Sequence, residues 1–217
     1  MNRTGPEIPT VSLRMFTFEE TQNSKQESLS VSIPEVLDAQ YGMYVWPSAV
    51  VLAQYIWSRR ADVKDKTVLE LGAGVSLPGV LASRCGAKVI LSDAADSPAC
   101  LENCRRSCEA NGLCDVLTLP LTWGEISPRL LQLPRLHLIL ASDVFYEPRD
   151  FEDILVTVAF LLRKNPNAQF WMTYQERSAI IMAFKSPGFP LFVVRPYPPA
   201  NRGRPLLCPH NGCVQNH

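Results

Sequence analysis

Short apolar runs alternate with longer amphipathic segments along most of the chain from Thr67 onward. The runs are rich in Val, Ile and Leu and have the length of strands, whereas the longer segments carry apolar residues at helical spacing. We expect strands near 67–71, 88–92, 115–119, 136–141 and 168–173, and helices near 78–85, 97–111 and 150–164. This alternation predicts an α/β domain with a doubly wound, mostly parallel sheet covered by helices on both faces.

The two ends of the chain depart from this pattern. Residues 1–40 are a polar extension with short alternating stretches at Val11–Phe18 and Leu29–Ile33, which predict edge strands. Residues 179–217 contain no Asp or Glu and many prolines, which remove backbone donors and bar a central strand. We expect this basic tail to be mostly disordered, with "LFVV" able to pair only as an edge strand. The domain itself is then expected over residues 41–178.

Composition narrows the class of protein. A chain of 217 residues is long enough for one α/β domain with appendages. Lys plus Arg equals Asp plus Glu at 21 each, so we expect no direct binding to nucleic acid and no attraction to an anionic membrane. There is no signal-peptide pattern and no apolar run of membrane-spanning length. Seven scattered cysteines suit a reducing compartment, so we expect the cytoplasm and nucleus.

A glycine pair follows the first expected strand of the domain, in "VLELGAGVSLPG". Gly72 and Gly74 allow a tight turn and let a ligand approach the backbone closely, at the edge of an α/β sheet where ligands bind. Asp93 ends the next strand, nineteen residues beyond Gly74, close to the spacing at which an acid reaches a ribose in dinucleotide folds. Together the two features predict a ligand that contains a nucleoside.

Departures from the dinucleotide pattern indicate which ligand it is. Leu77 stands where the third glycine of G-x-G-x-x-G would fall, and Glu70 is expected to point a negative charge into the crevice. A carboxylate there opposes a pyrophosphate but favours an ammonium or sulfonium, and a hydrogen bond to a charged group contributes about 1.5–3 kcal/mol. We therefore predict S-adenosylmethionine, with Glu70 near its amino-acid moiety, directly or through water, and Asp93 on its ribose. An NAD-linked oxidoreductase fits the glycine pair but not Glu70 or Leu77.

Several stretches together carry a family resemblance: "VLELGAGVSLPG", "VILSD", "LTWG", "ILASDVFYEPRDFEDIL" and "MTYQERS". The chain resembles the class I, seven-strand methyltransferases of the methyltransferase-like group over roughly Leu29 to Ser178. The resemblance implies a Rossmann-like fold, S-adenosylmethionine as cofactor, and a protein substrate methylated on a side-chain nitrogen. It points to an arginine of a histone, or to a lysine of another protein such as a chaperone.

The resemblance also implies functional residues. The cofactor-binding residues it gives are Trp46, Glu70, Gly72, Gly74, Asp93, Trp123 and Ser142. Trp123 would lie against the adenine and Trp46 would help to close the cofactor side. Without the family, both tryptophans would be interpreted as core aromatic residues.

The catalytic candidates are Asp143 and Tyr146, which match the D-x-x-Y/F signature of the group in "SDVFY". A carboxylate beside the cofactor orients a cationic nitrogen and eases its deprotonation, which for an ordinary lysine at pH 7 costs about 4.6 kcal/mol. The alternative interpretation of Asp143 is an acid at the N-terminus of the helix that follows. We expect no metal site, because "CPHNGC" offers three candidate ligands without a partner cluster.

The chain departs from the group's pattern after Ser178, where the proline-rich tail begins. Members of the group continue there into a helix and an antiparallel strand pair that completes the sheet. We interpret the change as an alternative or shifted coding end, and expect the strand pair to be missing or altered. A competing hypothesis follows, in which the chain is a catalytically inactive variant of the fold that acts as a protein-interaction module.

Overall fold

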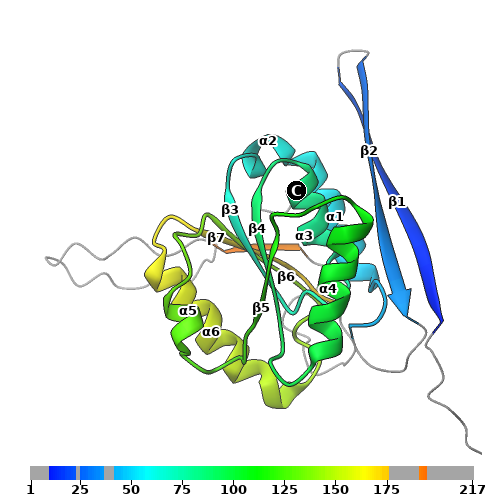
Figure 1. The fold of residues 1–217 in the computed structure, drawn as a ribbon. Helices are drawn as coiled ribbons and strands as arrows, with labels where there is room; N and C mark the ends of the chain where they lie inside the picture. The colour runs from blue at the N-terminus through cyan, green and yellow to red at the C-terminus, as the bar shows by residue number, and fades with distance from the viewer. Residues whose placement is uncertain (1–9, 23–24, 37–41, 176–190, 195–217) are drawn as a thin grey trace, which may run out of the picture.

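A six-stranded sheet lies at the centre of the computed structural model, which describes residues 10–22, 25–36, 42–175 and 191–194 (Figure 1). Its strands are β3 (Thr67–Leu71), β4 (Lys88–Asp93), β5 (Leu117–Pro120), β6 (Leu138–Ser142), β7 (Gln169–Thr173) and β8 (Leu191–Val194), in the order β5-β4-β3-β6-β7-β8. Strands β3 to β7 are parallel. The predicted doubly wound sheet is therefore confirmed.

Helices cover both faces of this sheet, as Figure 1 shows. They are α1 (Pro47–Ser58), α2 (Arg60–Val63), α3 (Leu77–Arg84), α4 (Pro98–Ala110), α5 (Pro128–Leu131) and α6 (Phe151–Lys164), with a 3-10 turn η1 at Pro148–Asp150. Helices α1, α3 and α4 share one core cluster and α5 and α6 share the other. The predicted helices near 78–85, 97–111 and 150–164 correspond to α3, α4 and α6.

Two-sided burial explains why the central strands are almost continuously apolar. In β3, Val68 packs in the core under α1 and α3, whereas the next residue, Leu69, packs in the core under α6. Both are fully buried. A strand covered on both faces has no solvent side, so it shows no alternation of apolar and polar residues. Glu70 is the exception in this strand, and its surroundings are described with the site.

The two strands expected near the N-terminus form a hairpin of their own. β1 (Val11–Gln22) and β2 (Lys25–Val36) pair antiparallel as a separate two-stranded sheet, so they do not extend the parallel sheet as edge strands. The hairpin packs an apolar face on the helices instead: Phe18, Val31 and Ile33 are buried in the same core as α1 and α3. Figure 1 shows the hairpin in blue beside these helices.

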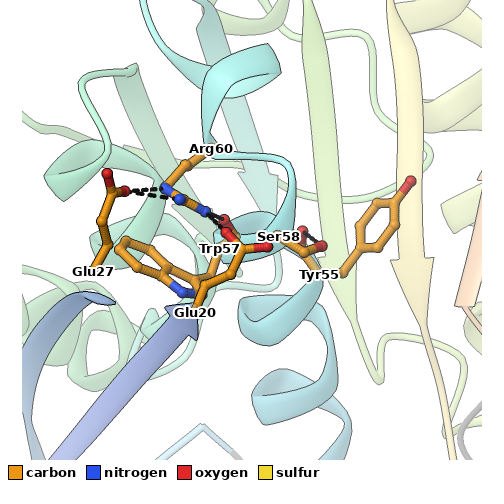
Figure 2. A network of polar contacts seen from close by, with 6 residues as sticks. All are labelled: Glu20, Glu27, Tyr55, Trp57, Ser58 and Arg60. Carbon is orange, nitrogen blue, oxygen red and sulfur yellow. Dashed lines mark hydrogen bonds and ion pairs between the residues drawn. The ribbon is translucent and has the colours of Figure 1, made fainter. Parts of the chain in front are cut away.

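Arg60 fastens the hairpin to the helical layer (Figure 2). Its guanidinium donates hydrogen bonds to Glu20 on β1 and to Glu27 on β2, the latter at 3.2 and 2.8 Å from Nε and Nη2. It also donates to the carbonyl of Trp57 at 3.0 Å, and lies 4.4 Å from the centroid of the Trp57 ring. The hydrogen bonds to Glu20 and Glu27 raise the pKa of Arg60 above its ordinary value.

Replacing Arg60 by alanine is expected to lower the free energy of unfolding by about 2 kcal/mol, because hydrogen bonds to charged groups contribute about 1.5–3 kcal/mol each and these are partly exposed. The melting temperature should then fall by about 4–8 °C. Thermal unfolding followed by circular dichroism measures it, with Arg59→Ala as control. Arg59 forms an exposed ion pair with Asp62 at 2.7 Å, so its loss should cost less than about 1 kcal/mol. Equal shifts of the melting temperature for the two variants would contradict the role of Arg60 in holding the hairpin on the helices.

Backbone pairing places Leu191–Val194 antiparallel beside β7, with Thr173 opposite Leu191 and Phe170 opposite Val194. The prediction that "LFVV" pairs as an edge strand is therefore confirmed. The predicted disorder of the remaining tail and the predicted loss of a strand pair concern residues outside the described part of the chain. In that part, no helix has the length and apolar character needed to cross a membrane.

Candidate active site

A cavity of about 340 Å³ lies at the carboxyl ends of β3, β4 and β6, where the strand order reverses. This is the usual place for a ligand in an open α/β sheet, and cavities of about 300–1,000 Å³ are typical of ligand sites. It is lined by eight of the nine predicted site residues: Trp46, Gly72, Gly74, Asp93, Trp123, Ser142, Asp143 and Tyr146. The topology thus brings together side chains that are up to a hundred positions apart in the sequence.

The glycine loop between β3 and α3 needs its glycines for two reasons. Gly72 and Gly74 have φ of 59° and 52°, in the left-handed region that other residues rarely adopt. A Cβ on Gly72 would lie 3.2 Å from Cζ2 of Trp123, and a Cβ on Gly74 would lie 3.0 Å from Cα of Gly42. The loop therefore packs closely on Trp123 on one side and on the segment before α1 on the other.

Asp93 holds the glycine loop in place. Its Oδ2 accepts a hydrogen bond from the backbone N–H of Gly74 at 2.7 Å, and its Oδ1 accepts one from Ala94 at 2.8 Å. Burial raises the pKa of Asp93, and these two N–H groups oppose the rise. A carboxylate has about four acceptor positions, so Asp93 can accept further hydrogen bonds from hydroxyl groups of a ligand in the cavity.

Two side chains of helix α4 donate hydrogen bonds to carbonyls of the same loop. The thiol of Cys104 donates to the carbonyl of Gly74 at 3.3 Å, and the hydroxyl of Ser107 donates to the carbonyl of Val75 at 2.7 Å. Both side chains are fully buried. These small side chains let α4 approach the loop closely enough to bond its carbonyls.

Glu70 does not face the cavity, and the prediction that it points a negative charge into the crevice is wrong. Its side chain is fully buried, and Oε2 accepts a hydrogen bond from the N–H of Gly79 in α3 at 3.0 Å. In the described part of the chain, Oε1 has no hydrogen-bond partner. Strand alternation is the reason, since it turns Glu70 toward α3. Burial raises its pKa to about 8, so at neutral pH the carboxyl is mostly uncharged.

Stability should depend on pH through Glu70. The carboxyl titrates at its ordinary value of 4.5 when unfolded and at about 8 when folded. The folded state therefore binds more protons in this window, and the unfolding free energy falls as pH rises from about 4.5 to about 8, by at most about 1.4 kcal/mol per pH unit. Urea unfolding at several pH values should give a flatter profile for Glu70→Gln, because glutamine has no carboxyl to titrate. Some slope should remain, since Asp93 titrates in both proteins. Identical slopes would contradict the buried, protonated carboxyl.

Asp143 follows the last residue of β6 in a strained conformation. Its φ of 59° lies in the left-handed region and its side chain is buried, with 6% exposed. Its N–H donates to the carbonyl of Thr173 at 2.7 Å, and its Oδ1 accepts from the N–H of Gln175 at 3.1 Å. The end of β7 thus fixes both backbone and carboxylate at the cavity, and such backbone strain is often found at functional sites.

Sequence reasoning missed part of the cavity. Gly42, Tyr44 and Val45 also line it, although only Trp46 was predicted from the same stretch, "YGMYVWPSAV". The rings of Tyr44 and Trp46 pack together with centroids 4.7 Å apart at 41°. The available signal was a glycine and two aromatic residues, Tyr44 and Trp46, within the five positions before a helix-starting proline.

A family model described as "Lysine methyltransferase" matches residues 25–186. The chain belongs to the lysine methyltransferase family. Members with similar sequences include "Histone-arginine methyltransferase METTL23" of Xenopus laevis, 61% identical over 166 residues, which are 76% of this chain and 71% of the relative. The METTL23 of Mus musculus is 57% identical over 168 residues, which cover 76% of this chain and 66% of the relative. "Protein-lysine methyltransferase METTL21E" of Mus musculus is 35% identical over 134 residues, covering 57% and 53%.

A solved structure, the "SAM Dependent Methyltransferase from Agrobacterium tumefaciens", has the same fold. It aligns with a TM-score of 0.54 and 16% identity, over 77% of this chain and 55% of that one. The family assignment makes this chain an S-adenosylmethionine-dependent protein methyltransferase. The cavity suits that cofactor, because the glycine loop offers backbone without Cβ atoms, Asp93 offers acceptors and Trp123 offers a flat apolar surface.

Proposed function

We propose that this enzyme methylates arginine side chains of histones, with lysine of another protein, such as a chaperone, as the second candidate acceptor. The observation that supports the proposal is sequence similarity: the METTL23 relatives of frog, mouse, rat and human are 56–61% identical to this chain, whereas the METTL21E relative of mouse is 35% identical. The METTL23 relatives are named as histone-arginine enzymes and METTL21E as a protein-lysine enzyme. The family description favours lysine, and it supports the second candidate.

The cofactor is proposed to lie along the glycine loop. Asp93 would accept from the ribose hydroxyls, Trp123 would lie against the adenine, and Gly72 and Gly74 would border the methionine part. Ser142 and Trp46 border the same cavity from β6 and from the start of α1. Glu70 contributes by holding α3, and with it the loop, through its hydrogen bond with Gly79.

Asp143 is proposed to bind the acceptor nitrogen, with Tyr146 beside it on the same loop. When bound, S-adenosylmethionine supplies a methyl carbon on a sulfonium, and the protein mainly has to hold the nucleophile in line. A carboxylate fixed by Gln175 attracts a guanidinium or ammonium and localises its charge. For lysine it would also ease the loss of the proton that must precede attack.

Labelling of histones tests the acceptor. The purified chain is incubated with core histones and radiolabelled S-adenosylmethionine, and the modified residues are identified after hydrolysis. Asp93→Ala serves as the control that should lose cofactor affinity. Label in methylarginine is the expected result. Label in methyllysine alone would make lysine the acceptor residue, and absence of label on the histones despite bound cofactor would reject histone arginine as the acceptor.

A further inference from the structure

Four residues of the stretch 42–48 line the cavity, namely Gly42, Tyr44, Val45 and Trp46, and we call this stretch the rim segment. At one end, Gly42 lies against the glycine loop, since a Cβ on Gly74 would be 3.0 Å from Cα of Gly42. At the other end, the carbonyl of Ser48 accepts a hydrogen bond from Oγ1 of Thr173 at 2.8 Å. Thr173 is also the residue whose carbonyl bonds the N–H of Asp143. The rim segment therefore connects the proposed cofactor side with the proposed acceptor side.

The hairpin and α4 hold the rim segment in position. Oε1 of Glu35 on β2 accepts from the N–H of Val45 at 2.8 Å, and the N–H of Val36 donates to the carbonyl of Met43 at 2.8 Å. From α4, Nδ2 of Asn103 donates to the carbonyl of Gly42 at 3.4 Å. The side chains of the rim segment are thus carried by backbone that is bonded on both sides.

Tyr44 lies in the middle of the rim segment, and 37% of it is exposed to solvent while it also lines the cavity. Its ring rests against the ring of Trp46, with centroids 4.7 Å apart. The described lining of the cavity contains Asp93, Asp143 and four aromatic residues, but no Lys, Arg or His. A mouth of this composition suits a guest that carries positive charge, because aromatic faces and carboxylates both attract cations.

We propose that Tyr44 recognises the acceptor, as an aromatic rim that contacts the cationic side chain of the protein substrate on its way to Asp143. Trp46 keeps the ring of Tyr44 in place. This inference rests on the proposed function, since it needs a cationic side chain as acceptor. It makes Tyr44 a specificity-determining residue for the protein substrate and not for the cofactor.

Steady-state kinetics with an arginine-containing histone peptide, together with titration of S-adenosylmethionine, tests the inference on the full chain. Tyr44→Ala is expected to lower kcat/KM for the peptide by about 5- to 30-fold, the range of a cation–π contact. Its Kd for S-adenosylmethionine should stay within about twofold of the original value, which also shows that the variant is folded. Tyr44→Phe keeps the ring and should retain most of the activity, and Leu131→Ala, an exposed apolar position on α5, serves as control.

Three results would overturn the inference. Unchanged kcat/KM for Tyr44→Ala would show that the ring does not meet the acceptor. A parallel loss of cofactor affinity would make Tyr44 a cofactor-binding residue, and equal losses for Tyr44→Phe and Tyr44→Ala would assign the effect to the hydroxyl. Failure of the unaltered enzyme to methylate any arginine or lysine, with cofactor bound, would instead reject the proposed function itself.

Discussion

Replacing Asp143 by asparagine is expected to reduce kcat for methyl transfer by about 100-fold or more, the usual contribution of a group that handles the reacting proton or charge. The carboxylate is the negative group beside the proposed acceptor position, and an amide neither attracts the cation as strongly nor localises its charge. Cofactor affinity should be almost unchanged, because the residues proposed to hold S-adenosylmethionine come mainly from the loops after β3 and β4.

Asparagine removes the negative charge of Asp143 and should leave the local structure unchanged. Asparagine tolerates the left-handed conformation that Asp143 adopts, and its amide oxygen can still accept from the N–H of Gln175. Asp115→Asn, at an exposed position before β5, is the matched control and should keep full activity. Methylation rates and calorimetric Kd values for the three proteins decide the matter. Equal losses of rate and of cofactor affinity would mean that Asp143 serves cofactor binding.

Replacing Gly79 by alanine should have the largest effect on stability. A Cβ at this position would overlap with Cδ2 of Leu91 and with Oε2 of Glu70, both of which are fully buried. Overpacking of a core costs about 1–3 kcal/mol, and loss of the Gly79–Glu70 hydrogen bond would leave a buried carboxyl without a partner at about 1–3 kcal/mol more. We expect a loss of about 3 kcal/mol or more, and a melting temperature lower by about 6–12 °C.

Thermal unfolding with and without S-adenosylmethionine measures this effect. Arg84→Ala, at an exposed position of the same helix α3, should change the melting temperature by less than about 2 °C. A Gly79→Ala protein with unaltered stability would show that α3 can move away from β3. That result would contradict the role assigned to Glu70, which is to fix helix α3 through its hydrogen bond with Gly79.

Most of the fold could be predicted because local sequence patterns indicate its strands and helices. In β3, Val68, Leu69 and Leu71 are apolar and buried, and α3 follows a glycine pair that indicates a tight turn. The cavity followed from topology, since the carboxyl ends of parallel strands meet at one edge and the glycine pair and Asp93 lie at such ends.

The direction of Glu70 could not be predicted from motif spacing alone. Its place in the sequence suggested a ligand contact, but a strand turns alternate side chains to opposite faces, and α3 covers the face to which Glu70 points. The pairing of the N-terminal strands with each other could also not be predicted, because an edge strand and a strand of a separate hairpin show the same alternation of apolar and polar residues. Tyr44 was missed because its local signal, a place between Gly42 and the helix-starting Pro47, does not separate a cavity-lining residue from a core aromatic residue.

Calorimetric titration of S-adenosylmethionine into the purified chain tests the central claim most directly, with Asp93→Ala as the control. Our account predicts micromolar binding by the original chain, and loss of that binding when the carboxylate that holds Gly74 and faces the cavity is removed. Absence of binding by a chain that is folded would contradict the account, and would favour the interaction module instead.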